Sequence, residues 1–141
     1  MRMIVEELRR VAERYDCILF ATLFGSAAAG RRHRHSDVDV AVYLREGCDP
    51  LDFIASFSAD VAEALGVDDV DVLILNGDLP YELRYRALTG RLIYARDRER
   101  YVEEVVKAAS LWADFRIALE KTRAREKFAE RLWARSRGSP H

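Results

Sequence analysis

The chain has 141 residues, of which 50% are hydrophobic and 33% charged, and its formal net charge is −1. This length and composition indicate one globular domain with a single core. No apolar run approaches the ~20 residues of a transmembrane helix, so a membrane-spanning protein is excluded. The small net charge gives no overall attraction to nucleic acid, and we expect no direct nucleic-acid binding.

The two cysteines, Cys17 and Cys48, are too few for a disulfide framework. We interpret both as reduced thiols. The first residues lack the apolar segment of a signal peptide. Together these features predict a cytoplasmic protein.

The first predicted elements are a helix and a strand. Apolar residues recur at helical spacing over residues 2–15, which predicts an amphipathic helix. Residues 17–24 form a short apolar run of strand length, and Gly25-Ser26 follow it as a turn. Glycine lets backbone N–H groups approach a phosphate closely, and the serine hydroxyl adds a donor. The small residues 27–29 suit the start of a short helix, whose N-terminus would favour an anion.

A basic run, Arg31–His35, follows the turn. It either contacts a triphosphate or pyrophosphate, or it is a solvated loop. The histidines have no cysteine partner at a spacing typical of zinc sites.

The second predicted strand, residues 37–44, begins with two acids. Because side chains alternate along a strand, Asp37 and Asp39 point to the same face, while Val38, Val40 and Val42 point to the other. Adjacent carboxylates repel each other unless a cation lies between them. Oxygen ligands together with substrate phosphates are what Mg²⁺ prefers, so this pair predicts a metal–nucleotide site beside Gly25-Ser26.

An acid also lies near the start of the next predicted strand. Residues 51–65 have the apolar spacing of a helix, with Gly66 at its C-cap. Residues 70–75 then read as the third strand, with Asp71 near its start. Asp69 shares the face of Asp71 and is the fallback, and Asp68 fits a loop better. Such an acid can bind metal or accept a proton.

The remaining elements are helical apart from one edge strand. Residues 80–89 predict a helix with Pro80 at its first position, and residues 91–95 a short edge strand. Arg84, Tyr85 and Arg86 lie on this helix, where they either contact a nucleotide or acceptor or are solvated.

Residues from about 97 to 135 are helical in pattern, and a break near residue 120 is expected because one helix of that length is unusual. Residues 98–141 carry a charge balance of +4 against −5 for residues 1–97. This basic helical tail either suits an acidic partner or is only solvated. Phe128, Leu132 and Trp133 lie on it and either contact a partner or second copy, or pack on the chain's own core.

The combination of Gly25, Ser26, Asp37 and Asp39, with ten residues between the two pairs, resembles the signature of the DNA polymerase β-like nucleotidyltransferase superfamily. The short length and the segment Leu79–Asp97 are similar to the minimal nucleotidyltransferases of the MNT or MntA type, which are often encoded beside a HEPN-domain ribonuclease toxin. The resemblance covers about residues 1–97.

The resemblance implies an α/β fold in which helices flank a small mixed sheet. Residues 1–97 would form the nucleotidyltransferase domain, residues 98–135 a helical extension packed on it or on a partner, and residues 136–141 a frayed end. It also implies that ATP binds at Gly25-Ser26, that one or two Mg²⁺ ions bind Asp37 and Asp39, and that Asp71 completes the acidic cluster.

The implied reaction is transfer of AMP from ATP to a tyrosine of a HEPN toxin, which would make the chain an antitoxin. Two alternatives remain. One is an antitoxin that neutralises its partner by binding alone, and the other is an aminoglycoside-type nucleotidyltransferase. The latter class generally has a larger C-terminal domain to hold the drug.

Overall fold

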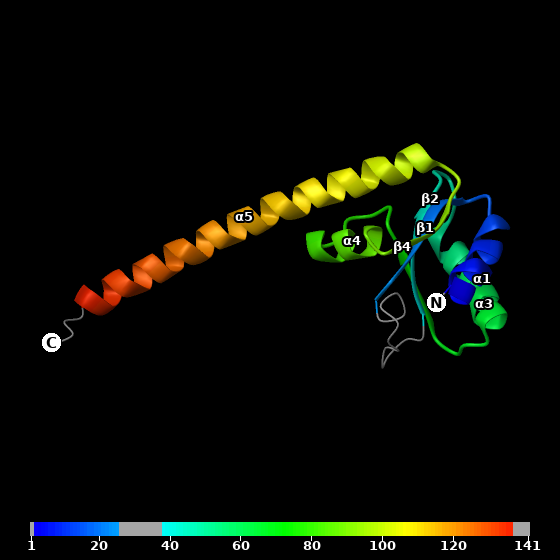
Figure 1. The fold of residues 1–141 in the computed structure, drawn as a ribbon, viewed down its shortest axis with the longest axis horizontal. Helices are drawn as coiled ribbons and strands as arrows, with labels where there is room; N and C mark the ends of the chain where they lie inside the picture. The colour runs from blue at the N-terminus through cyan, green and yellow to red at the C-terminus, as the bar shows by residue number, and fades with distance from the viewer. Residues whose placement is uncertain (1, 26–37, 137–141) are drawn as a thin grey trace.

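The computed structural model describes residues 2–25 and 38–136. Figure 1 shows a small sheet with helices on both sides and one long helix that projects from it. In chain order the elements are α1 (Arg2–Glu13), β1 (Ile18–Phe24), β2 (Val38–Leu44), α3 (Pro50–Leu65), β3 (Val70–Ile74), α4 (Tyr81–Leu88), β4 (Arg91–Ala95) and α5 (Arg98–Ser136). The predicted α/β class with a small mixed sheet is confirmed.

The four strands form one sheet in the order β3-β2-β1-β4. β1 runs antiparallel to both β2 and β4, whereas β2 and β3 are parallel. Helix α3 provides the crossover that a parallel pair requires. β4 lies at an edge, as the sequence predicted.

Each face of the sheet packs against its own pair of helices. One face and helices α1 and α3 share a core that includes Leu8, Val40 and Phe57. The other face packs against α4 and the first half of α5 around Phe20 and Leu88. Figure 1 shows α1 and α3 on the opposite side of the sheet from α4. The alternation of side chains along each strand therefore decides which helices a residue meets.

The ends of α3 follow from local sequence. The Asp49 side chain accepts a hydrogen bond from the Leu51 N–H, and Pro50 occupies the first turn. Gly66 closes the helix with φ of 66°, and its N–H donates to the carbonyl oxygen of Ala62. The predicted glycine C-cap is confirmed. In α4, by contrast, Pro80 is the N-cap and the helix begins at Tyr81, one residue later than predicted.

The interpretation of both cysteines as reduced thiols is wrong, because Cys17 and Cys48 form a disulfide. Their Cα atoms are 6.1 Å apart. Pairing of β1 with β2 brings them together, since the Arg45 N–H donates to the Cys17 carbonyl oxygen at 2.7 Å and Cys48 follows in the same turn. Two cysteines separated by 31 residues gave no sequence signal for this antiparallel pairing.

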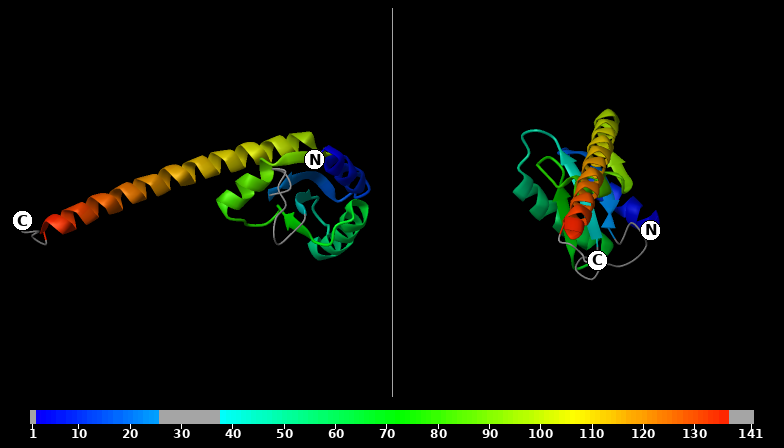
Figure 2. Two further views of the ribbon diagram at one scale, coloured as in Figure 1. Left: turned by 60° about the horizontal axis from the view of Figure 1, so that its bottom comes forward. Right: turned by 90° about the vertical axis from the view of Figure 1, so that its left-hand side faces the viewer.

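The expected break near residue 120 is also wrong. Helix α5 runs without interruption for 39 residues. Its first half packs on the domain, and every residue from 113 to 136 is exposed. The left view of Figure 2 shows this second half projecting away from the sheet. Packing of Phe128, Leu132 and Trp133 into the chain's own core is therefore excluded. Within the described ranges, no helix has the length and apolar character needed to cross a membrane.

Disulfide loss should lower the stability of the fold. A cross-link that closes a loop of this length removes chain entropy from the unfolded state worth about 3–4 kcal/mol. Cys48→Ser should therefore lower the free energy of unfolding by roughly that amount in urea titrations. Reductant should shift the wild-type midpoint to the same value and leave that of the variant unchanged. Equal midpoints with and without reductant would contradict a stabilising role.

Tyr15 should give a pH-dependent contribution to stability. Its hydroxyl donates to the Asp60 carboxylate, and its ring packs edge-on against Phe53 and Phe57. Burial, followed by the hydrogen bond and charge of Asp60, raises the pKa of Tyr15 to about 12 from 10.0. A raised folded-state pKa means that the contribution is complete below pH 10 and is lost as the pH rises towards 12.

The comparison of wild type with Tyr15→Phe isolates this contribution. The stability difference between the two proteins should be constant from pH 7 to 9 and should shrink between pH 10 and 12. Urea unfolding at each pH measures it. A difference that stays constant up to pH 12 would show that Tyr15 titrates normally.

Candidate functional site

The candidate site lies at the end of the sheet where β1 finishes and β2 and β3 begin. Antiparallel pairing sets Phe24, the residue before Gly25, opposite Asp39. Parallel pairing sets Asp39 opposite Asp71. Gly25, Asp39 and Asp71 therefore lie side by side on three adjacent strand ends, although they are far apart in sequence.

Asp39 and Asp71 point to the same face of the sheet. Paired residues of neighbouring strands share a face, and the residues two positions further on, Ala41 and Leu73, pack in the core beneath α4 and α5. Asp39 is half-buried and Asp71 is exposed. Parallel strands lie ~4.8 Å apart, so the two carboxylates are close enough to act on one group.

Gly25 is held against Asp39. Its φ is 76°, in the region that favours glycine. A Cβ atom added at this position would lie 2.5 Å from Oδ2 of Asp39. Glycine is therefore required here both by the backbone conformation and by the space that the carboxylate occupies. This close approach explains why glycine occupies position 25.

Several predicted site residues lie outside the described residues. They are Ser26, the small residues 27–29, the basic run Arg31–His35 and Asp37. Their roles stay predictions from the sequence.

The register distinguishes between the candidate third acids. Asp71 is the residue paired with Asp39. Asp69 lies before the strand, where its carbonyl oxygen accepts a 3.3 Å hydrogen bond from the Val38 N–H. Asp68 is further from the strand, in the connection after α3. The geometry thus favours Asp71 over the fallback.

In the described part of the chain, no group of three or more His, Cys, Asp or Glu side chains is arranged to hold a metal ion. The donor set there is the pair Asp39 and Asp71. Two carboxylates on one sheet face are hard oxygen donors of the type that Mg²⁺ takes, and they leave room for phosphate oxygens and water. The pair therefore fits a magnesium site that a further ligand completes.

Of the three α4 residues that the sequence offers as nucleotide or acceptor contacts, two make contacts within the fold and one is exposed. Arg84 donates to the carbonyl oxygens of Leu75, at 2.9 Å, and of Gly77. Tyr85 stacks against Trp112 of α5 with ring centroids 6.2 Å apart. Arg86 is exposed. Arg84 thus fixes the end of β3 and Tyr85 holds α5, which favours structural roles for both.

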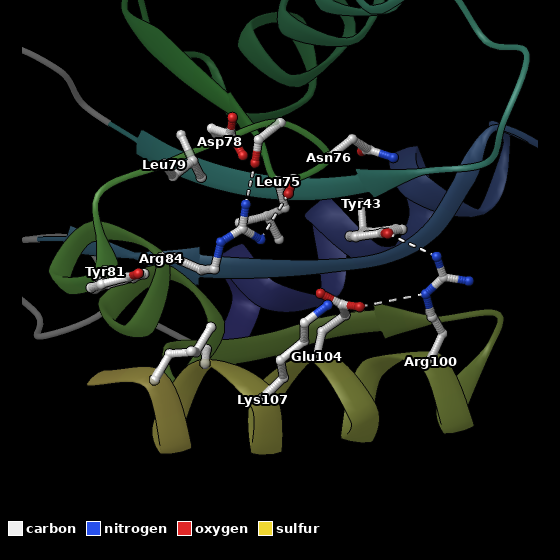
Figure 3. Close-up of a pocket in the computed structure, with 13 residues that line it drawn as sticks. Tyr43, Leu75, Asn76, Asp78, Leu79, Tyr81, Arg84, Arg100, Glu104 and Lys107 are labelled. Carbon is white, nitrogen blue, oxygen red and sulfur yellow. Dashed lines mark hydrogen bonds and ion pairs between the residues drawn. The ribbon is translucent and has the colours of Figure 1, made fainter. Parts of the chain in front are cut away.

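A cavity of about 360 Å³ lies on the same sheet face, between the end of β3 and helices α4 and α5. Figure 3 shows Arg84, Arg100 and Lys107 reaching towards it. Arg100 donates to the Tyr43 hydroxyl at 2.8 Å, which raises the pKa of the guanidinium, and it lies 3.6 Å from Glu104. No sequence motif indicates this cavity, because its residues come from separate elements.

Thr22 attaches α4 to the sheet near the candidate site. It is a fully buried polar residue, and its hydroxyl donates to the Ala87 carbonyl oxygen at 2.6 Å. Gly90 packs directly on the backbone of Leu23, where an added Cβ would collide with the Leu23 carbonyl oxygen. These contacts fix the helix beside the strand that leads to Gly25.

Comparison with known proteins identifies both sequence and structural similarity. The family model described as polymerase beta, nucleotidyltransferase matches residues 6–99. No curated protein matches the chain in sequence.

Several solved structures share the fold. A crystal structure of a toxin–antitoxin with AMP-PNP is 20% identical with a TM-score of 0.64, covering 87% of this chain and 98% of the other. An MntA–HpeT toxin–antitoxin mutant is 21% identical with a TM-score of 0.63, covering 89% and 97%. A complex of tri-AMPylated Shewanella oneidensis HEPN toxin with MNT antitoxin is 16% identical with a TM-score of 0.61, covering 89% and 98%.

Two glycine variants test the contact between Gly25 and Asp39. Gly25→Ala should destabilise the fold by about 1–3 kcal/mol, because it combines an unfavourable φ with a collision at the Asp39 carboxylate. Gly47→Ala is the matched control, since Gly47 has φ of 93° but nothing within 4 Å of an added Cβ. Gly47→Ala should therefore lower the free energy of unfolding only by the cost of the unfavourable backbone conformation. Urea unfolding measures both.

The double variant Gly25→Ala/Asp39→Ala removes the colliding carboxylate. It should be less destabilised than the sum of the two single variants. Additive effects, or equal losses for the two glycine variants, would show that Asp39 does not restrict position 25.

Proposed function

Since this chain belongs to the polymerase beta nucleotidyltransferase family, whose model matches residues 6–99, we propose that it moves AMP from ATP to a hydroxyl group of a partner protein. The observation that carries the proposal is the in-register pair of Asp39 and Asp71, with Gly25 packed against the first. This arrangement places negative charge and open backbone at the same end of the sheet.

Gly25, Asp39 and Asp71 each have a part in this reaction. Gly25 lets the turn approach the triphosphate without a side chain in the way. Asp39 and Asp71 would hold Mg²⁺, with Asp37 as the further ligand that the sequence motif suggests. When bound, the ion would neutralise charge on the phosphates and pyrophosphate. Asp71, as the exposed acid, would also accept the proton of the attacking hydroxyl.

The chemistry balances without another reactant. The hydroxyl oxygen of the acceptor forms a bond to the α-phosphorus of ATP, and the bond from that phosphorus to the bridging oxygen of the β-phosphate breaks. Pyrophosphate leaves, and the hydroxyl proton passes to a carboxylate. The protein contributes mainly position and charge, as in phosphoryl transfer generally.

The neighbouring structures support a protein acceptor. They include a toxin–antitoxin with AMP-PNP and a tri-AMPylated HEPN toxin with MNT antitoxin. By analogy we propose that the acceptor is a tyrosine of a HEPN-type toxin and that the chain acts as its antitoxin. The exposed second half of α5 favours a second candidate, an antitoxin that neutralises its toxin by binding alone.

Asp39→Asn should reduce AMP transfer by on the order of 100-fold or more, because it removes a negative charge from the metal site. The measurement uses ATP labelled at the α-phosphate, Mg²⁺ and a purified HEPN protein, with label on the protein band as readout. Asp52→Asn is the control, since Asp52 is an exposed acid on α3, on the other face of the sheet. It should transfer normally.

The ribonuclease activity of the HEPN protein separates the two candidates. If the Asp39→Asn variant loses labelling and no longer silences the ribonuclease, catalysis is the function. If it silences the ribonuclease without labelling, neutralisation by binding is the function. Full labelling by the variant would refute the role of Asp39.

A further inference from the structure

Helix α5 carries a line of exposed apolar side chains. We call this line the outer stripe; its members are Val102, Val106, Ala113, Ile117, Ala124, Phe128 and Leu132. The five large side chains among them are 48–59% exposed. The first six members form two series that repeat every 11 residues. Eleven residues are close to three helical turns, so the stripe runs along one side of a nearly straight helix.

The outer stripe is distinct from the side of α5 that packs on the domain. That packed side contains Tyr101, Val105, Ala108 and Trp112. The Tyr101 ring meets Phe20 of β1 edge-on, with centroids 5.2 Å apart, and Ala108 is buried. The stripe begins with Val102 and Val106, each one residue after a packed residue, and at ~100° per residue this turns it away from the domain.

The projecting half of α5 is exposed at every residue, and near its start the Phe115 ring meets Tyr81 of α4 edge-on. An isolated helix of about 20 residues is marginal in water unless its sequence supplies its own support. In this half, Arg123 and Lys127 are four residues apart, and so are Lys127 and Arg131. Like charges at this spacing destabilise a helix. Packing against another helix would supply the missing stabilisation.

The outer stripe is symmetric about Ile117. Val106 and Phe128 lie equally far before and after Ile117, and so do Val102 and Leu132. If a second copy of α5 packs antiparallel with the two Ile117 residues facing each other, every large apolar side chain of the stripe therefore meets another one. A two-fold axis at Ile117 generates this arrangement, in which both copies use the same surface.

Charged residues fit the same antiparallel register. Glu99 and Arg135 are also equally far from Ile117, so they meet at each end of the stripe. Near the two-fold axis, residues on the same flank of the two helices form oppositely charged pairs. Asp114 of one copy meets Lys121 of the other, and Arg116 of one copy meets Glu120 of the other. The two-fold axis repeats each pair.

Other orientations fit less well. Parallel pairing would align identical residues and place the basic positions Lys121 and Arg135 against themselves. In the antiparallel register two like-charged pairs meet at the rim: Lys107 with Arg125, and Arg116 with its own copy beside the axis. A rim pair is screened by solvent and costs little, which suits a reversible dimer.

We propose that two copies of this chain form an antiparallel dimer through the outer stripe of α5, with the two-fold axis at Ile117. Each projecting half then covers the outer side of the other copy's domain-bound half. The two nucleotidyltransferase domains lie at opposite ends of the helix pair, and their candidate sites take no part in the contact.

Sedimentation equilibrium of the full chain, without nucleotide or partner protein, tests the dimer. The wild type should show a concentration-dependent rise to twice the mass of the chain. Ile117→Asp places two carboxylates face to face and should raise the dissociation constant by on the order of 100-fold. Leu119→Asp is the matched control, because Leu119 lies on α5 outside the stripe, and its dissociation constant should not change.

A charge exchange keeps the test valid if Ile117→Asp unfolds part of the helix. Glu99→Arg should weaken the dimer and Glu99→Arg/Arg135→Glu should restore it, with circular dichroism confirming equal helix content. A wild type that stays monomeric at all concentrations, or a dimer that Ile117→Asp leaves intact, would overturn the proposal.

Cross-linking tests the register. Ile117→Cys should be linked into a covalent dimer by a short bismaleimide under non-reducing conditions, because the two copies of position 117 face each other. Ser110→Cys lies on the same side of α5 but faces Ala124 of the second copy, so it should not be linked. Linking of both variants would show parallel pairing. Since no ligand or partner is present, these results do not depend on the proposed function.

Discussion

The parallel pairing of β2 with β3 is the constraint on which the candidate site depends. Parallel strands cannot be joined by a tight turn, so α3 must cross one face of the sheet to bring β3 beside β2. The register that results sets Asp39 against Asp71, and a shift by one residue would turn the acids to the α1 and α3 side. The buried valines of β2 resist such a shift, because it would move them out of the core. Packing on one face thus positions charge on the other.

The two faces of the sheet differ in polarity and therefore in role. On the face under α1 and α3, the inward-facing residues of β1, β2 and β3 are apolar. The opposite face is apolar only where α4 and α5 cover it, and it becomes acidic where the cover ends. Thr22 and Gly90 set the position of α4 and so the limit of that cover. A small domain can in this way combine a closed core with an accessible cluster of like charges.

Sequence reasoning succeeded where local rules decide the structure. Alternation predicted that Val38 and Asp39 face opposite ways, and the glycine at position 66 predicted the end of α3. It failed where distant segments meet. The disulfide between Cys17 and Cys48 depends on strand pairing. Helix α5 is continuous because residues 98–136 contain no glycine or proline, whereas the usual length of helices had led us to expect a break. The cavity beside Arg84 and Arg100 draws on four elements, which no single segment reveals.

The disulfide also has a topological consequence. Cys17 and Cys48 enclose β1, Gly25, Asp39 and β2 in one covalent ring. A single peptide-bond cleavage within that ring opens it without dividing the molecule, since the two fragments stay joined through sulfur. A nicked chain would therefore keep Gly25 and Asp39 on one covalent body and would come apart only in a reducing medium.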